Sequence, residues 1–178
     1  IARWNGITWR NMHSGMSGCV RALCVYNGKL YAAGNFIYAS ELVCNGIAKW
    51  DGAVWHPVGY GIAGGETTIY TLCVYNGELW AGGSFTSMNN LPALNIAKFN
   101  GDTWSASGEG ATGMSCYLSN GCVSDMKVCG GKLFVTGQFT KIDGVNVNKL
   151  ASFNGQYWCP VEFGLDVMPQ KLEVYNDD

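Results

Sequence analysis

The chain has 178 residues, which is enough for one domain of ordinary size or for one part of a larger one. Its 25 glycines make up about 14% of the residues, roughly twice the usual share, whereas charged residues make up only 13%. With 48% hydrophobic residues and a net charge of −2, the composition excludes a disordered chain and argues against binding to nucleic acid through charge.

Pairs of turn-forming residues recur along the chain between alternating apolar segments. Such pairs tolerate the positive φ angles of tight hairpin turns. They are Asn5-Gly6, Asn27-Gly28, Asp51-Gly52, Asn76-Gly77, Asn100-Gly101, Gly130-Gly131 and Asn154-Gly155. The intervals between them are 22, 24, 25, 24, 30 and 24 residues, and this regular spacing predicts a series of β-hairpins.

Two kinds of hairpin alternate. One joins a Leu-Cys-Val-Tyr strand to a Leu-Tyr-Ala-Gly strand, as in residues 23–36, 72–85 and, more loosely, 126–139. The other carries Ile-Ala-Lys-Trp before its turn and Trp after it, and its four copies begin at residues 1, 47, 96 and 150, with periods of 46, 49 and 54. Each period therefore holds four strands, named a, b, c and d in chain order, which is the unit of a β-propeller blade. We predict an all-β fold of the β-propeller type, with four-stranded antiparallel blades.

In chain order, this pattern predicts a single propeller segment over 1–178. Residues 1–19 supply strands c and d of a partial blade, residues 20–62, 63–110 and 111–165 form three complete blades, and residues 166–178 supply strand a of a partial blade. Three interpretations of the loose ends are open. In the first, the two ends share one blade of a small closed ring. In the second, the chain is part of a longer propeller. In the third, the two ends complement a neighbouring copy in an open assembly such as a filament. The second is favoured because strand b of the last blade is missing.

These repeats resemble a known group of sequences. The glycine after Leu-Tyr-Ala, the aromatic residue of strand c and the tryptophan that opens strand d are similar to a kelch-type blade. A closer similarity is to the secreted Ile-Ala-x-Trp-Asp-Gly repeats of bacterial surface proteins and fungal cortical-marker proteins. The resemblance covers essentially the whole chain and implies the propeller fold. It implies little about activity, because such propellers host enzymes, lectins and scaffolds alike.

Eight cysteines, without a Cys-x-x-Cys pair or histidines at zinc-finger spacing, favour disulfides in an oxidising compartment over a zinc site. The predicted strand order suggests four pairs, namely Cys19–Cys44, Cys116–Cys122, Cys24–Cys73 and, by elimination, Cys129–Cys159. For Cys24 and Cys73 the alternative is a buried reduced thiol in the middle of a strand. The expected location is extracellular or at the cell surface.

No residue pattern indicates catalysis or a cofactor. Residues 59–64 and 108–113 match the dinucleotide pattern Gly-x-Gly-x-x-Gly, but each leads into a predicted strand, whereas nucleotide binding requires a helix there. The two histidines, His13 and His56, have no metal-ligand spacing, and the carboxylates are scattered. We therefore expect no catalytic residue, no metal and no cofactor.

The repeated tryptophans are expected to pack between blades, since they recur at fixed positions. Aromatic residues in the connections, Tyr38, Tyr60 and Tyr117, are candidates for stacking on a glycan. The preferred prediction is a non-enzymatic structural or interaction module that self-associates through incomplete terminal blades. Its partner is a protein, including a second copy, and no nucleic acid or membrane insertion is expected, because no apolar run approaches 18 residues. The alternatives are a carbohydrate-binding propeller and a fragment of a larger propeller enzyme.

Overall fold

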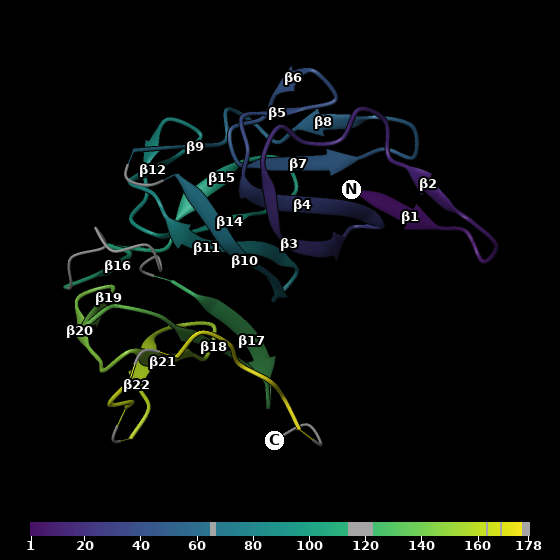
Figure 1. Cartoon of the computed structure of the whole chain (residues 1–178). Coiled ribbons are helices and arrows are strands. Elements are labelled where there is room, and N and C mark those ends of the chain that lie inside the picture. Colours follow the sequence, from purple (N-terminus) through teal and green to yellow (C-terminus); the bar gives the residue numbers. More distant parts are fainter. Residues whose placement is uncertain (65–66, 114–122, 163, 168, 176–178) are drawn as a thin grey trace.

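The computed structural model describes residues 1–64, 67–113, 123–162, 164–167 and 169–175 of the chain (Figure 1). Throughout these ranges the regular secondary structure is β-strand, so the predicted all-β fold is confirmed. Three antiparallel four-stranded sheets follow one another along the chain, and each uses its strands in the order a, b, c, d. No helix within the described ranges is long and apolar enough to cross a membrane.

The three sheets are the three predicted complete blades. The first blade consists of β3 (Cys19–Tyr26), β4 (Lys29–Asn35), β7 (Ile47–Trp50) and β8 (Trp55–Pro57). The second consists of β10 (Thr68–Tyr75), β11 (Glu78–Ser84), β14 (Ile96–Phe99) and β15 (Trp104–Ala106). The third consists of β17 (Asp125–Cys129), β18 (Lys132–Thr136), β21 (Leu150–Phe153) and β22 (Trp158–Pro160).

The two hairpin types form different turns. In the a–b turns, both central residues have positive φ, as in Asn27-Gly28 (47° and 70°) and Asn76-Gly77 (49° and 76°). In the c–d turns only the glycine does, and the preceding side chain holds the turn. The Asn100 Oδ1 atom, for example, accepts hydrogen bonds from the backbone N–H groups of Asp102 and Thr103 at 2.9 and 2.8 Å. The repeated Asn-Gly signal therefore encodes two turn chemistries.

A repeated glycine closes strand b because strands a and b approach closely there. The first two inner strands contain a β-bulge, with register shifts between Val20 and Ala22 and between Ile69 and Thr71. A Cβ atom on Gly34 would overlap the carbonyl oxygen of Cys19, and one on Gly83 would overlap that of Thr68. The glycines near the ends of these strands are thus required by the bulged pairing.

Short strands in the connections link consecutive blades, a feature that the sequence pattern did not predict. Each b–c connection folds into a small hairpin, and the second and third of these also pair with a strand from the preceding d–a connection. The first group is β5 (Tyr38–Ala39) and β6 (Leu42–Val43), with a bridge from Met16 to Ala39. The others are β9 (Ile62–Ala63), β12 (Ser87–Met88) and β13 (Leu91–Pro92), then β16 (Ala111–Thr112), β19 (Lys141–Ile142) and β20 (Val145–Asn146).

The hydrophobic core lies between blades. One cluster joins the facing sides of the first and second blades and another joins the second and third. The strand d tryptophans Trp55, Trp104 and Trp158 are 0%, 3% and 4% exposed. Trp104 and Trp158 lie in the two interblade clusters, as predicted, whereas Trp55 packs with Met12 and residues of its own blade. At the N-terminal end, β1 (Ala2–Trp4) and β2 (Trp9–Asn11) form a separate two-stranded hairpin, where the equivalent Trp9 is 69% exposed.

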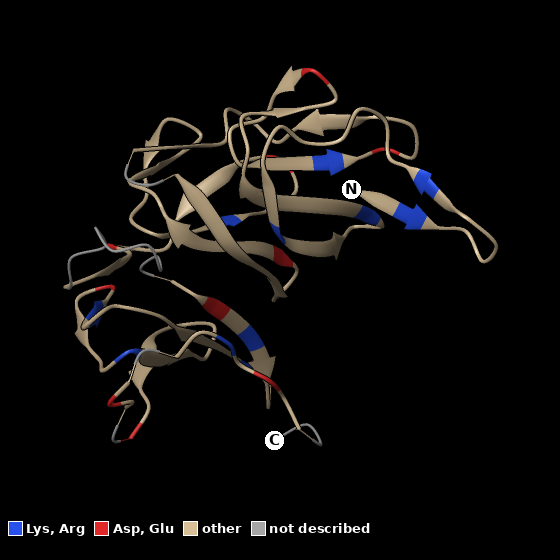
Figure 2. Cartoon of the chain, in the orientation of Figure 1, with Lys and Arg blue, Asp and Glu red and all other residues tan. Residues whose placement is uncertain are grey.

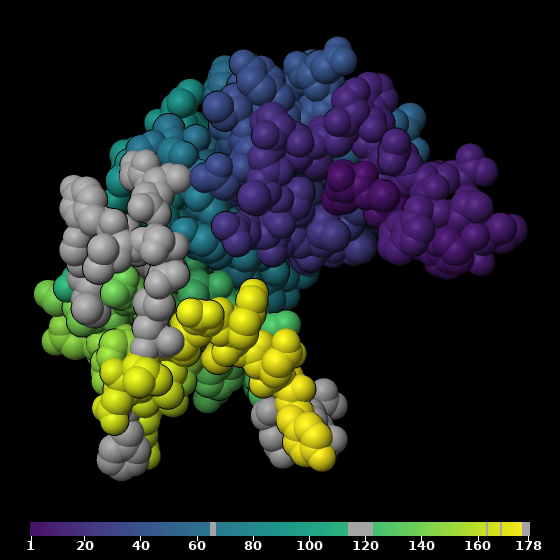
Figure 3. Space-filling model, viewed as in Figure 1, coloured from purple at the N-terminus to yellow at the C-terminus, as the bar shows by residue number. Residues whose placement is uncertain are grey.

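The blades are arranged as an arc (Figures 1 and 3). The β1–β2 hairpin projects at one end, and the yellow C-terminal segment lies over the third blade at the other (Figure 3). Acidic and basic residues are spread over all three blades and intermixed (Figure 2). This distribution agrees with the net charge of −2, which gives the chain no strong overall field.

Candidate interaction surface

The inner strands of the three blades, β3, β10 and β17, run side by side, with β10 in contact with both others. Because the sequence repeats, each position of strand a in one blade has an equivalent position in strand a of the next blade. Thr71 of β10 is thus equivalent to Asp125 of β17, since each lies four residues before the last residue of its strand and pairs with strand b near its end, at Gly82 and Thr136. Equivalent side chains of the inner strands therefore lie next to one another, and each contact between them joins one blade to the next.

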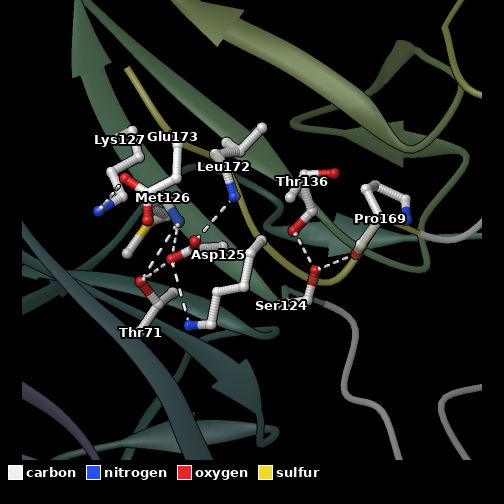
Figure 4. A network of polar contacts seen from close by, with 10 residues as sticks. Thr71, Ser124, Asp125, Met126, Lys127, Thr136, Pro169, Leu172 and Glu173 are labelled. Carbon is white, nitrogen blue, oxygen red and sulfur yellow. Dashed lines mark hydrogen bonds and ion pairs between the residues drawn. The ribbon is translucent and has the colours of Figure 1, made fainter. Parts of the chain in front are cut away.

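The step from the second to the third blade is a buried polar contact (Figure 4). Thr71 Oγ1 donates a hydrogen bond to Asp125 Oδ1 at 2.9 Å and accepts one from the backbone N–H of Met126 at 3.2 Å. The side chain of strand a in one blade therefore holds the backbone of strand a in the next. Asp125 is only 3% exposed, and a buried carboxylate needs such partners.

The same contact is repeated one step further, between the third blade and the C-terminal segment. The backbone N–H of Leu172 donates to Asp125 Oδ2 at 2.9 Å, as that of Met126 does to Thr71 (Figure 4). Two ion pairs run alongside, Lys127–Glu173 at 3.8 Å and Lys171–Asp125 at 3.9 Å. Residues 171–175 therefore occupy the position of strand a in a fourth blade, as the sequence pattern predicts, although within the described ranges no strand pairs with them.

Burial of one valine per inner strand shows which strands have a preceding neighbour. Val74, Val128 and Val174 are equivalent, and they are 37%, 36% and 36% exposed. Val25, at the same position of β3, is 66% exposed. The valine of the C-terminal segment is thus covered as fully as those of β10 and β17, whereas no strand in the described part of the chain covers Val25 of β3 in this way.

The uncovered side of the first blade is apolar, and we call it the first-blade open face. It consists of Leu23, Val25, Leu30 and Trp50. Leu23 is 54% exposed, and Leu30 is partly exposed, whereas its equivalent Leu79 in the second blade is fully buried against the first blade. The outer part of the same side is covered, because Met12 and Met16 pack with Trp55 and Ala48. Only the inner half of this side is therefore open.

A tyrosine at the end of strand a clamps each blade to the next. The Tyr26 ring lies between Tyr31 of its own blade and Phe99 of the second blade, with centroid distances of 5.8 and 6.3 Å, and its hydroxyl donates to the carbonyl of Gly77 at 2.9 Å. Tyr75 repeats this arrangement toward the third blade, with its hydroxyl 3.2 Å from the carbonyl of Gly131. Such aromatic pairs stabilise an interface beyond the area that they bury.

The clamp is interrupted at the third blade. Cys129 stands at the position of Tyr26 and Tyr75, because it closes β17 directly before the a–b turn. The tyrosine returns in the C-terminal segment as Tyr175, whose side chain is 79% exposed. The side of the third blade formed by Cys129, Phe134 and Leu150, which we call the third-blade open face, is partly exposed.

The cysteines do not form the predicted bridges that fall within the described residues. Cys19, Cys24, Cys44, Cys73 and Cys159 are free thiols. Cys19 is exposed at the start of β3, whereas Cys44 is fully buried beside Trp55 and Ala39. Cys129 and Cys159 lie on the inner and outer strands of one blade, three strand spacings or about 14 Å apart, which is beyond the reach of a disulfide. Cys116 and Cys122 lie outside the described residues.

The alternative interpretation for Cys24 and Cys73 holds in part, because both are reduced thiols but only half-buried. Burial raises the pKa of the Cys24 thiol, and burial together with the neighbouring Cys24 raises the pKa of the Cys73 thiol to about 11. Both thiols therefore stay protonated at neutral pH and behave as small hydrophobic side chains. The extracellular location stays a prediction. The predicted disulfides on which it was based are not formed among the described residues.

The candidate glycan-stacking residues are dispersed. Tyr38 begins β5 and is 48% exposed, and Tyr60 lies in the first d–a connection and is 69% exposed. The two tyrosines lie in different connections, and Tyr117 lies outside the described residues. Stacking on a glycan stays a prediction.

The other motifs contribute no site. The Gly-x-Gly-x-x-Gly segments at 59–64 and 108–113 contain the short strands β9 and β16. His56 Nε2 lies 2.7 Å from Asp51 Oδ2 at a c–d turn, where it supports the turn. In the described part of the chain no group of three or more histidine, cysteine or acidic side chains is arranged to hold a metal ion.

A family model described as "Domain of unknown function (DUF5122) beta-propeller" matches residues 131–155, which extend from the a–b turn of the third blade to its c–d turn. The chain is thus similar to a β-propeller repeat over this stretch, in agreement with the fold. No curated protein matches the chain.

Proposed function

We propose that the chain is a non-enzymatic β-propeller module that acts in protein–protein interaction, and that it associates head to tail through its two open faces. The repeats are proposed to be of the kelch-like type, on the strength of the strand d tryptophans and the glycine near the end of strand b. The observation that carries the proposed interaction is the exposure of Leu23 and Val25 at positions that a neighbouring inner strand normally covers.

The first-blade open face and the C-terminal segment are complementary in kind. In the second blade, Gly77 of the a–b turn and Phe99 contact the clamp tyrosine of the preceding blade, and in the third blade Gly131 and Phe153 do the same. On the first blade, the equivalent surface is formed by its own a–b turn and Trp50. On the C-terminal segment, Tyr175 is a clamp tyrosine with an exposed ring. A contact that joins the tail of one copy to the head of the next is heterologous and repeats along an open chain of subunits unless rotation closes it.

The β1–β2 hairpin adds a second complementary feature. It has the sequence pattern of strands c and d, while residues 171–175 have that of strand a. Met12, directly after the hairpin, packs in the cluster that Leu30 and Trp50 of the first-blade open face also contact. Trp4 and Trp9 of the hairpin contact each other at 5.7 Å and are 53% and 69% exposed. Exposed apolar side chains beside unpaired strand edges favour pairing with another chain.

Sedimentation velocity over a range of concentrations tests the proposal. We expect the unmodified chain to associate and the double variant Leu23→Asp with Val25→Asp to need at least about tenfold more protein, because two charges then have to be desolvated at the contact. Leu91→Asp is the control, since Leu91 is 49% exposed on a connection hairpin away from both open faces. A chain that stays monomeric, or a double variant that associates like the control, would contradict the proposal.

A further inference from the structure

A groove lies between the third-blade open face and the C-terminal segment. Its volume is about 170 Å³, and its walls are formed by Lys127, Cys129, Phe134 and Leu150 on one side and by Leu172 and Val174 on the other. The walls are mainly apolar, apart from the Lys127–Glu173 ion pair at the rim. The groove thus lies beside residues that already occupy the place of strand a in a fourth blade.

The internal repeats identify what occupies the equivalent space elsewhere. Phe134 and Leu150 are equivalent to Tyr31 and Ile47 of the first blade, which are 4% and 0% exposed. Those two side chains are covered by strand b of the second blade, β11, through Leu79 and Ala81. Phe134 and Leu150 are only partly buried. The groove is therefore the position of strand b in the fourth blade.

We propose that this groove binds an extended strand of the b type, which pairs antiparallel with residues 171–175. The chemistry that the groove recognises is a leucine, a small apolar residue two positions later and a glycine two positions after that, as in Leu79, Ala81 and Gly83. β4, β11 and β18 share the leucine and the small apolar residue, in the pairs Leu30 and Ala32, Leu79 and Ala81, and Leu133 and Val135. This inference rests on the proposed interaction function and specifies the type of strand that the groove takes up.

Two physical contributions support binding. Within the described ranges no strand pairs with residues 171–175, which Asp125 holds in place through the Leu172 N–H, so their remaining backbone N–H and C=O groups are available for strand addition. The apolar walls then receive the alternating side chains of the added strand, as they do in the complete blades. Backbone pairing gives the orientation, and the leucine and alanine give the selectivity.

The test titrates a fluorescently labelled peptide of residues 78–84, the sequence of β11, into the full chain at a concentration where sedimentation shows it to be monomeric. We expect saturable binding, and about tenfold or more weaker binding for a peptide with Leu79→Asp and Ala81→Asp, because two apolar contacts are lost. The Val174→Asp chain should lose affinity to a similar extent, whereas Leu91→Asp should not. Hydrogen exchange should show new protection within residues 132–136 and 171–175.

Equal affinity of the two peptides, or protection at β3 in place of these segments, would overturn the inference. Failure here is distinguishable from failure of the proposed function. If the chain associates with itself but does not distinguish the peptides, only the strand-acceptor groove is rejected. If the monomeric chain binds the peptide selectively but never associates, head-to-tail association is rejected and the groove remains.

Discussion

The first and second blades present nearly the same side chains toward the N-terminal end of the arc, but in different surroundings. Leu72 and Leu79 of the second blade pack into the core shared with the first, whereas Leu23 and Leu30 on the first blade stay partly or largely exposed. Because the residue types match, the difference comes entirely from whether another blade is present. A propeller blade thus has apolar side chains on both of its faces, and its stability depends on the adjacent blades that cover them.

The largest expected difference between the two blades concerns the equivalent leucines of strand b. Leu79→Ala should lower the free energy of unfolding by about 2–5 kcal/mol, since it leaves a cavity in the interblade core. Leu30→Ala is the matched control and should cost much less, because the Leu30 side chain is only partly buried. Urea unfolding followed by tryptophan fluorescence measures both. Equal losses would mean that the two faces do not differ as described.

The next effect sharpens the comparison at the third blade, where Asp125 holds the C-terminal segment. Asp125→Asn should destabilise the chain by about 1–3 kcal/mol, because the new amide cannot accept hydrogen bonds at both of its terminal atoms and one N–H donor then faces another. Hydrogen exchange at Leu172 should accelerate as well. Asp102→Asn, at an exposed turn position, is the control. Unchanged exchange at Leu172 would show that Asp125 does not dock the segment.

A smaller effect distinguishes a closed clamp from an open one. Tyr75→Phe removes a hydroxyl that lies 3.2 Å from the carbonyls of Gly131 and Phe153, and should cost about 1 kcal/mol in unfolding free energy. Tyr175→Phe removes the equivalent hydroxyl where the ring is 79% exposed, and should leave the stability of the monomer unchanged. Thermal unfolding of both variants is the measurement. A Tyr75→Phe chain as stable as the Tyr175→Phe chain would argue against the clamp.

The smallest effect concerns the c–d turn of the first blade, where Asp51 replaces the asparagine of the other copies. The N–H groups of Val54 and Ala53, and then His56, hold the pKa of the Asp51 carboxyl well below its usual range. A lowered pKa contributes stability that is present above the ordinary carboxyl pKa of about 3.9 and is lost as the pH falls toward the lowered value.

Asp51→Asn should therefore make unfolding less dependent on pH between about pH 4 and pH 2, while keeping the turn hydrogen bonds that Asn100 and Asn154 make. Urea midpoints of both chains across this range provide the measurement. Asp102→Asn serves as the control here too, since Asp102 is an exposed carboxylate at the c–d turn of the second blade. Parallel pH profiles for Asp51→Asn and the unmodified chain would contradict this prediction.

The repeated patterns by themselves determined the fold class, the four-stranded blades and the buried tryptophans. They could do so because turn residues and alternating apolar side chains act locally, and a blade is assembled from hairpins between neighbouring segments. The pattern also placed a lone inner strand at residues 171–175. It did not predict the connection strands, whose two-residue pairings join β9 to β12 and β16 to β19, because so short a segment carries no periodic signal.

Only the tertiary structure decided which of the repeated side chains are covered and which cysteines can meet. Cys129 and Cys159 lie within one blade, yet two strands separate them. Leu23 and Leu72 follow the same local pattern, yet they differ in burial because one blade lies against a neighbour and the other does not. The local sequence determines each hairpin turn and the register of its two strands, because both depend on short-range backbone geometry. The burial of a side chain depends on contacts between residues about 50 positions apart, which only the packing of whole blades brings together.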